Sequence, residues 1–420
     1  MSPPPVELTI DTLGGGADGI AQGPDGPVYV PYALPGERVA VEIEGRRSEG
    51  ATARLVQVLE PARDRVTPAC PHFGRCGGCA LQHLAQAPYL AWKRQRVVDA
   101  LARRGLNETP VHPTVATPAA TRRRVRFAAR RSKRGTTIGF NARRSRRIVD
   151  LTACPVLRPV IPALLPALRR LLDALLGVGE SVDLQLTETT SGIDLWIVSA
   201  REPDLEARQA LAAFAAEQDL ARLHWGEAEP QCIVVRRPAA IAFADVAVEV
   251  PADAFLQASI AGEAAIRDRV LVALGSARDV ADLFAGCGTL SLPLAAAARV
   301  HAVDQDEAAL TALAAAARAR PGLAEVTVER RDLFLRPLGT AELGRFDAVV
   351  FDPPRAGARA QATAIASSSV PLVVAVSCHP GSFSRDARIL IDGGYDLVEV
   401  VPIDQFLWSP HVELVATFRR

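Results

Sequence analysis

The chain has 420 residues, of which 49% are hydrophobic, 23% charged and 5% aromatic. This is the composition of a globular protein with two or three domains, and it excludes disordered and fibrous classes. Seven cysteines are too few for a disulfide-stapled scaffold. No apolar run approaches the roughly 20 residues of a membrane helix, and the N-terminus lacks the features of a signal peptide. We therefore expect a soluble cytoplasmic protein.

The formal net charge of +1 hides a strong asymmetry along the chain. Residues 1–149 contain 24 Lys and Arg against 12 Asp and Glu, a net charge of +12, which leaves −11 for residues 150–420. Twelve basic residues and no acid lie within 122–147, and such a block favours nucleic-acid binding over a merely solvated Arg-rich face. The basic block consists of Arg122, Arg123, Arg124, Arg126, Arg130, Arg131, Lys133, Arg134, Arg143, Arg144, Arg146 and Arg147.

The elements predicted along the chain divide it into residues 1–62, 63–245 and 246–420. Short β-strands separated by Gly/Pro turns over residues 6–60 indicate a small barrel. The middle part combines a Cys-rich loop, a helix ending at Gly105, a hairpin from RVRFAARR and TIGFNARR with basic side chains on one face, and the strands VDLQLTE and IDLWIVS. From about residue 246, apolar strands alternate with Ala-rich helices, which predicts a parallel, doubly wound α/β sheet.

The segment DLFAGCGT reads as a strand that runs into Gly286 and Gly288 before a helix, and Asp304 closes the next strand. Glycines at such a turn let the backbone approach a ligand, and the acidic side chain can accept hydrogen bonds from ribose hydroxyls. Ser291 stands where a dinucleotide site has its third glycine, so S-adenosylmethionine is the better candidate ligand. The alternative is a tight structural turn.

Three further segments place reactive side chains at expected strand ends, where open α/β sheets bind their ligands. Asp352 and Arg355 follow the strand DAVVF in DPPRAG, and Cys378 ends the next strand. Glu413 lies in the terminal run HVEL. The thiol is a candidate nucleophile and the glutamate a candidate proton acceptor. The alternatives are a surface ion pair, an inert buried thiol and a solvated glutamate.

Four cysteines of the front half are candidate metal ligands. Thiolates in this number suit either zinc or a cubane iron–sulfur cluster, and the spacing alone does not choose between them. We expect Cys232 and Cys287, which belong to no ligand set, to be small buried residues. The candidate ligands are Cys70, Cys76, Cys79 and Cys154.

Taken together, six segments resemble the S-adenosylmethionine-dependent RNA uracil-5-methyltransferase family, in particular its iron–sulfur branch that acts on 23S ribosomal RNA. This resemblance implies a C-terminal Rossmann-like methyltransferase domain, an N-terminal OB-type barrel (TRAM domain) and a central α+β domain that carries a cluster and binds RNA. The segments, in chain order, are CPHFGRCGGCALQH, DAFLQAS, DLFAGCGTLSLPLA, DPPRAGA, VSCHPGSFSRD and HVEL.

The resemblance also implies roles for individual residues. Cys378 matches the nucleophile that adds to C6 of uracil, and Glu413 matches the base that removes the C5 proton. We hypothesise that Arg355 stabilises charge on O4 and that Asp352 holds the ring edge through N3. The positions that match the lining of the cofactor and base pocket, with the glycines of the turn, are Gln257, Phe284, Gly286, Gly288, Thr289, Asp304, Asp332 and Asp352.

For the front half, the resemblance favours a 4Fe–4S cluster that pins the Cys-rich loop to the basic hairpin. It implies 23S ribosomal RNA as the partner, with a monomer and no obligate protein partner as the default. Transfer RNA methylation, cytosine-5 methylation and a non-catalytic RNA-binding or assembly factor are the alternatives. Ser259 and Thr289 stand where asparagine is expected, which bears on details of cofactor contact.

Overall fold

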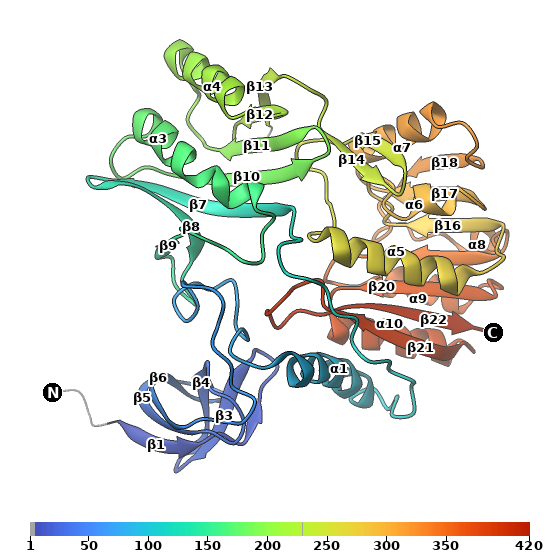
Figure 1. The fold of residues 1–420 in the computed structure, drawn as a ribbon. Helices are drawn as coiled ribbons and strands as arrows, with labels where there is room; N and C mark the ends of the chain where they lie inside the picture. Colours follow the sequence, from blue (N-terminus) through green and yellow to red (C-terminus); the bar gives the residue numbers. More distant parts are fainter. Residues whose placement is uncertain (1–4, 229) are drawn as a thin grey trace.

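The computed structural model describes residues 5–228 and 230–420. Figure 1 shows an N-terminal, a central and a C-terminal sheet that follow one another along the chain. Within these described ranges, no helix is long and apolar enough to cross a membrane.

The N-terminal sheet has the strand order β1-β5-β6-β4-β3-β2. Its strands alternate apolar and polar residues, so that Val39 and Val41 of one strand meet Val28 and Val30 of another in a small core. The strands predicted for residues 6–60 are thus confirmed, while the TRAM assignment stays a prediction. The strands are β1 (Val6–Thr9), β2 (Thr12–Leu13), β3 (Asp18–Gly23), β4 (Gly26–Pro31), β5 (Arg38–Arg47) and β6 (Gly50–Glu60).

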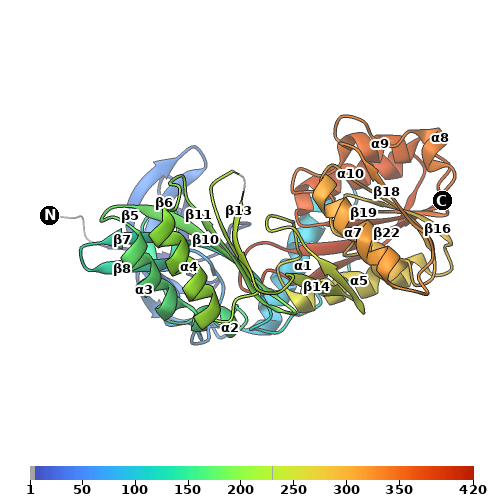
Figure 2. The same ribbon diagram turned by 90° about the horizontal axis from the view of Figure 1, so that it is seen from above.

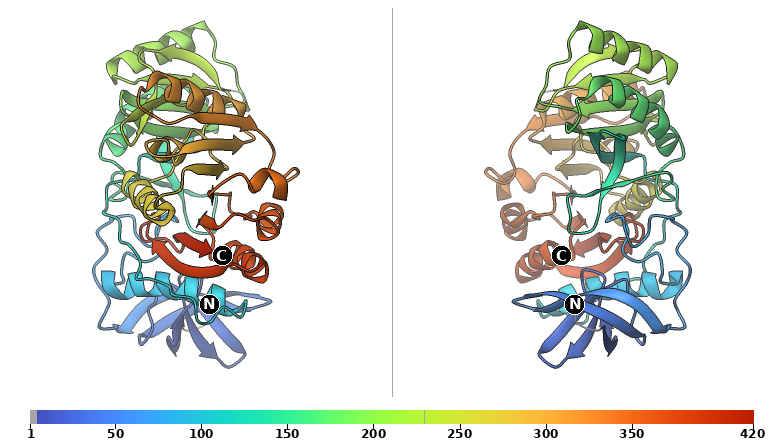
Figure 3. Two further views of the ribbon diagram at one scale, coloured as in Figure 1. Left: turned by 90° about the vertical axis from the view of Figure 1, so that its right-hand side faces the viewer. Right: turned by 90° about the vertical axis from the view of Figure 1, so that its left-hand side faces the viewer.

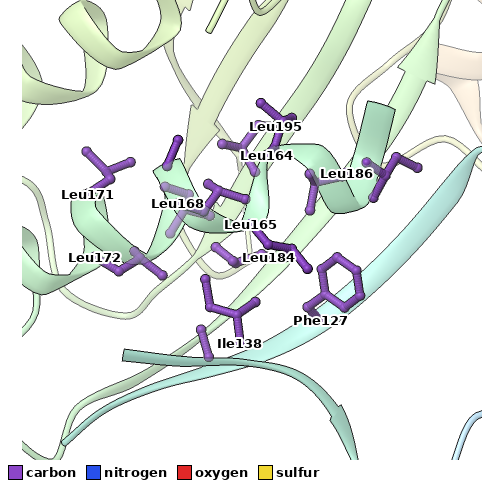
Figure 4. Close-up of a cluster of buried hydrophobic side chains, with 14 of the residues drawn as sticks. Phe127, Ile138, Leu164, Leu165, Leu168, Leu171, Leu172, Leu184, Leu186 and Leu195 are labelled. Carbon is purple, nitrogen blue, oxygen red and sulfur yellow. The ribbon is translucent and has the colours of Figure 1, made fainter. Parts of the chain in front are cut away.

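The central sheet has the order β13-β12-β11-β10-β7-β8-β9, and leucines of α3 pack on one of its faces. Figure 4 shows Leu165, Leu168 and Leu172, spaced along one helix face, against Phe127 and Leu184 of the sheet. The elements are β7 (Arg124–Ser132), β8 (Gly135–Asn141), β9 (Ile148–Asp150), α2 (Val160–Ala163), α3 (Leu165–Leu175), β10 (Ser181–Thr189), β11 (Gly192–Val198), α4 (Leu205–Glu217), β12 (Arg222–Trp225) and β13 (Gln231–Val235).

The predicted hairpin is formed by β7 and β8, which pair antiparallel and turn at Ser132–Gly135. Along β7 the apolar side chains face the core, while Arg126 and Arg130 are exposed. One expectation for this sheet was wrong, because Cys232 is exposed rather than buried. It lies on β13, the edge strand, which has fewer neighbours to cover it.

The C-terminal sheet is doubly wound, as predicted, with the order β18-β17-β16-β19-β20-β22-β21. Strands β16 to β20 run parallel to one another. Strand β22, which lies between β20 and β21, runs antiparallel to both. Val349 and Phe351 pack toward α9 and α10, while Ala348 and Val350 pack toward α5 on the other face. Figure 3 shows these helices on opposite faces of the sheet. The elements are α5 (Ile260–Leu274), β16 (Asp279–Leu283), α6 (Ser291–Leu294), β17 (Arg299–Asp304), α7 (Glu307–Ala319), β18 (Val326–Arg330), α8 (Thr340–Leu343), β19 (Ala348–Phe351), α9 (Arg359–Ala366), β20 (Leu372–Ser377), α10 (Pro380–Asp392), β21 (Asp396–Ile403) and β22 (Glu413–Arg419).

Two elements from earlier in the chain complete this C-terminal core. Helix α1 (Gln86–Ala102) buries Val97 and Leu101 in the same cluster as Phe383 and Leu390 of α10. The hairpin of β14 (Ala240–Phe243) and β15 (Val246–Glu249) packs on α7. Figure 2 shows the central and C-terminal sheets as neighbouring bodies with α1 and this hairpin between them. The core of the third sheet therefore begins before residue 246.

We expect Leu101→Ala to lower the free energy of unfolding by about 2–4 kcal/mol, because it empties a fully packed site between α1 and the C-terminal sheet. Urea denaturation followed by circular dichroism measures this loss. Gln95→Ala, on the exposed side of the same helix, is the control and should cost no more than about 0.5 kcal/mol. An unchanged midpoint for Leu101→Ala would contradict the packing of α1 on this core.

Candidate functional site

A cavity of about 480 Å³ opens at the carboxyl edge of the C-terminal sheet. The segments that follow β16, β19 and β20 bring Phe284, Asp352 and Cys378 to it, and β22 begins there with Glu413. Because carboxyl ends of neighbouring parallel strands meet at one edge, residues far apart in sequence converge here. The two carboxylates, the thiol and Arg355 that the sequence singled out all line this cavity.

The thiol of Cys378 is half-buried, and it faces negatively charged groups. Burial, together with the nearby carboxylates of Glu413 and Asp352, raises the pKa of Cys378 to about 11, and the Arg355 guanidinium opposes this rise. The thiol is therefore protonated in the free protein at neutral pH. It can become a nucleophile only after losing its proton.

Glu413 lies on an interior strand, between β20 and β21, and is only 2% exposed. Burial raises its pKa well above the ordinary value, and the charge of Asp352 raises it further. Burial likewise raises the pKa of Asp352 to about 7, while a hydrogen bond from Gln257 lowers it. Two buried carboxyl groups that repel each other as anions share this site, which is a common arrangement for proton transfer.

Two glutamines connect these carboxylates. The amide of Gln257 donates to Asp352 Oδ2 over 2.8 Å. The amide of Gln405 donates both to Gln257 Oε1 over 2.7 Å and to Glu413 Oε2 over 2.9 Å. The result is a continuous hydrogen-bonded path from Asp352 to Glu413.

The other end of the cavity suits an adenosyl ligand. Gly286 lines it with a φ of +52°, and a Cβ built there would meet no atom within 4 Å, so the backbone borders open space. Its N–H donates to Asp304 Oδ2 over 2.9 Å, which fixes the carboxylate at the rim. Phe284, with a φ of +63°, supplies an apolar wall next to Phe334. An acidic group, free backbone and aromatic surface are what a ribose and an adenine require.

Three residues predicted for the cofactor site do not line the cavity. Gly288 faces α7, since a Cβ there would lie 2.4 Å from Leu313 Cδ1, so this glycine serves close helix packing. Thr289 is half-buried in the turn before α6. The Asp332 carboxylate accepts a hydrogen bond from the Phe334 N–H over 2.9 Å and thereby shapes the loop after β18.

The sequence reasoning missed several residues that line the cavity. They include the exposed Phe255, and Arg331 and Phe334, which lie within two residues of the predicted Asp332. Gln405 and Phe406, in the loop before β22, also line it. Phe255 could have been found, because it lies two residues before Gln257 in a segment already singled out. The loop residues carry no periodic signal. Ser259, where asparagine was expected, caps α5 by accepting from the Gly262 N–H over 3.2 Å.

A second cavity, of about 170 Å³, is lined by all four candidate metal ligands. Burial raises the pKa of Cys79 to about 12 and raises the pKa of Cys154. No three His, Cys, Asp or Glu side chains within 5–228 and 230–420 converge as ligands of a single metal ion. Arg122, from the basic block, also lines this cavity.

The remaining basic block is only partly available at the surface. Arg123 is 4% exposed and bonded to Glu263, and Arg124 donates to the Asp253 and Ala254 carbonyls. Others pair with acids, as Arg131 does with Asp173 and as Arg143 does with Asp18. The exposed members are Arg126, Arg130, Lys133, Arg134, Arg144, Arg146 and Arg147.

Comparison with known proteins adds relatives that align over nearly the whole chain, although no protein-family model matches it. The chain is 47% identical over 416 residues to an uncharacterized RNA methyltransferase of Brucella melitensis, and the alignment covers 99% of this chain and 98% of the relative. It is 34% identical over 430 residues to the 23S rRNA (uracil(1939)-C(5))-methyltransferase of Chromohalobacter salexigens, with 98% of this chain and 89% of the relative covered.

Among solved structures, the fold matches the Pyrococcus abyssi tRNA (uracil-54, C5)-methyltransferase in complex with S-adenosyl-L-homocysteine. The TM-score is 0.77 at 24% identity, covering 98% of this chain and 99% of that one. This likeness bears on the fold alone and supports the mixed α/β methyltransferase architecture. With relatives at 34–47% identity over its length, the chain belongs to the S-adenosylmethionine-dependent RNA uracil-5-methyltransferase family and is an RNA methyltransferase.

Proposed function

We propose that this protein transfers a methyl group from S-adenosylmethionine to C5 of one uridine in 23S ribosomal RNA, through a covalent bond between Cys378 and C6. The observation that carries this proposal is the meeting of a thiol, a buried carboxylate and an arginine in one cavity. The choice of 23S rRNA rests on the similarity to the Chromohalobacter enzyme. Transfer RNA is the second candidate, because the Pyrococcus enzyme, whose fold matches over the full length, modifies tRNA.

Uracil C5 is a weak nucleophile, and a thiolate solves this by adding to C6. In the proposed reaction, the Cys378 thiol gives its proton to solvent, Sγ bonds to C6, and the electron pair of the C5–C6 double bond moves toward C5 and O4. C5 then takes up the methyl group of S-adenosylmethionine, whose S–CH3 bond breaks to leave S-adenosylhomocysteine. Glu413 next removes the C5 proton, the C5–C6 double bond reforms, and the C6–S bond breaks to release the thiolate.

Two further side chains suit the charges of this reaction. Arg355 is exposed at the cavity, where its guanidinium can face the negative charge that develops on O4. Asp352 can accept a hydrogen bond from N3–H of the ring, with Gln257 fixing its orientation. The target base must leave its stack to reach this cavity, so a single-stranded or flipped uridine is required. Exposed members of the basic block are proposed to bind the surrounding phosphates.

The protonated state of Cys378 predicts a steep pH dependence of its reactivity in the free protein. With a pKa of about 11, its thiolate fraction rises about tenfold per pH unit between pH 7 and 9.5. The rate of iodoacetamide labelling at Cys378, followed by peptide mass spectrometry, should rise accordingly. Labelling of the exposed Cys232 in the same sample controls for reagent and folding. A fast, pH-independent rate would show that the thiol is already ionised.

We also propose that Cys70, Cys76, Cys79 and Cys154 hold a 4Fe–4S cluster, which would supply a rigid four-thiolate link between distant segments. The donor set is soft, and all four thiols line one cavity. The half-buried Arg122 guanidinium, which lines the same cavity, would offset the negative charge of a thiolate-bound cluster. The Cys-rich loop already pairs with the end of β8, where the Gly77 N–H donates to the Asn141 carbonyl over 3.0 Å.

Anaerobically purified protein should therefore be brown, with a broad absorption at about 400 nm and iron in stoichiometric amount. Cys154→Ser should lose this colour, because one ligand is removed. Cys232→Ser, a thiol outside the cavity, is the matched control and should keep it. Colourless wild-type protein containing zinc would overturn the cluster assignment.

Nucleoside mass spectrometry of separated ribosomal and transfer RNA tests the substrate. Deleting the gene should remove 5-methyluridine from 23S rRNA only, and wild-type protein should restore it while Cys378→Ala does not. Loss from transfer RNA alone would keep the chemistry and replace the substrate. Restoration by Cys378→Ala would refute the covalent mechanism.

A further inference from the structure

Among the described residues, one oxygen of the Glu413 carboxylate accepts a hydrogen bond and the other accepts none. Gln405 donates to Oε2 over 2.9 Å, whereas no donor among the described residues reaches the buried Oε1. A base needs such an asymmetry, since one oxygen must be anchored while the other accepts the proton. In this site the anchor is a neutral amide, which orients the carboxylate without neutralising its charge.

The anchoring amide is itself held from two sides. Its second N–H donates to Gln257 Oε1 over 2.7 Å, and the Gln257 amide donates to Asp352. These directions leave each glutamine with one consistent orientation, because a flipped amide would set oxygen against oxygen. On the other side the Gln405 side chain packs against Gly262 of α5, where an added Cβ would lie 2.8 Å from Gln405 Oε1.

The backbone that carries Gln405 is fixed by buried polar contacts of Asp404. Lys93 and Tyr89 of α1 both bind Asp404 Oδ1, the tyrosine hydroxyl over 2.8 Å. The Thr117 hydroxyl donates to the Asp404 carbonyl over 2.5 Å, and Lys93 also donates to the Phe406 carbonyl over 3.0 Å. Gln405 therefore sits between two anchored residues and has little freedom to turn away from Glu413.

We propose that Gln405 is a positioning residue that holds Glu413 for removal of the C5 proton and couples it to Asp352 through Gln257. This proposal rests on the proposed function, in which Glu413 is the base. Gln405 touches neither the ring nor the methyl group in this scheme. It acts on the step after methyl transfer, in which the C5 proton passes to Glu413 and the C6–S bond breaks.

The test is Gln405→Met, which keeps the side-chain volume and removes both N–H donors. In single-turnover reactions with uridine RNA, the methylated Cys378–RNA adduct should persist roughly tenfold longer or more, seen as a slowly migrating band on denaturing gels. The kcat should fall by a similar factor while KM for RNA stays within about twofold. A general loss of folding would lower methyl transfer as well and would not enrich the adduct.

Two further variants make the result decisive. Gly262→Ala leaves the Gln405 amide intact but displaces its side chain, so it should lengthen the adduct lifetime in the same direction. Gln361→Met removes another buried amide, which bonds the backbone of Leu338 away from the cavity, and should leave the adduct lifetime unchanged. A normal adduct lifetime in folded Gln405→Met protein overturns the proposal.

Failure of the underlying chemistry gives a different result. RNA with 5-fluorouridine at the target traps the adduct, because a fluorine at C5 cannot be removed as a proton. Wild-type protein that forms no Cys378 adduct with this RNA would overturn the proposed function itself. Wild-type protein that forms it, together with unaffected turnover in Gln405→Met, would overturn only the role of Gln405.

Discussion

A buried ion pair between Lys93 of α1 and Asp404 in the loop before β22 fixes the geometry on which the rest of the site depends. The two side chains are 0% and 1% exposed. Burial lowers the pKa of Lys93 to about 8 and raises that of Asp404, while their mutual attraction opposes both shifts. Such a pair contributes little net stability, but losing one partner strands a buried charge. The loop is thereby restricted to the position in which α1 can reach it.

This loop lies between the two cavities of the protein. Phe406 lines both the cavity of the four cysteines and the cavity of Cys378. The Trp408 carbonyl accepts hydrogen bonds from the N–H groups of Ala80 and Leu81, directly after the Cys-rich loop. Trp408 itself adopts a φ of +56°, an uncommon conformation for a large side chain that persists because its neighbours hold it. The end of the Cys-rich loop and the loop before β22 are thus joined directly by hydrogen bonds.

The residues at the ends of strands could be predicted from the sequence, because apolar runs reveal the strands and parallel topology brings their carboxyl ends together. Cys378 and Asp352 were predicted to lie at this edge in this way, and both line the cavity there. The Lys93–Asp404 contact could not be found, since it joins positions 311 residues apart and neither belongs to a chemical motif. Gly288 shows a different limit: a glycine in a ligand-binding pattern can serve helix packing instead, and only its neighbours distinguish the two.

The basic block illustrates the same limit for electrostatics. Its twelve charges are contiguous in sequence, yet Arg123 bonds to Glu263 more than a hundred residues away, and Arg122 turns toward the cysteine cavity. The net charge of a segment predicts the sign of the surface charge, but it does not predict which of its side chains reach the surface. Here the exposed members gather on and after the β7–β8 hairpin, which the cysteine cavity adjoins.

The proposed reaction makes two opposing demands on the pKa values of the groups in this cavity. As the proposed base, Glu413 gains affinity for a proton from its burial and from the charge of Asp352. Burial and the same carboxylates raise the pKa of Cys378 and so hold the proposed nucleophile in its protonated form. Arg355, the cationic group that opposes this rise, lies at the cavity where the pyrimidine O4 is proposed to bind. In the proposed reaction this arginine would stabilise both the Cys378 thiolate before the attack and the enolate charge on the base after it, because its guanidinium lies at the cavity that Cys378 also lines.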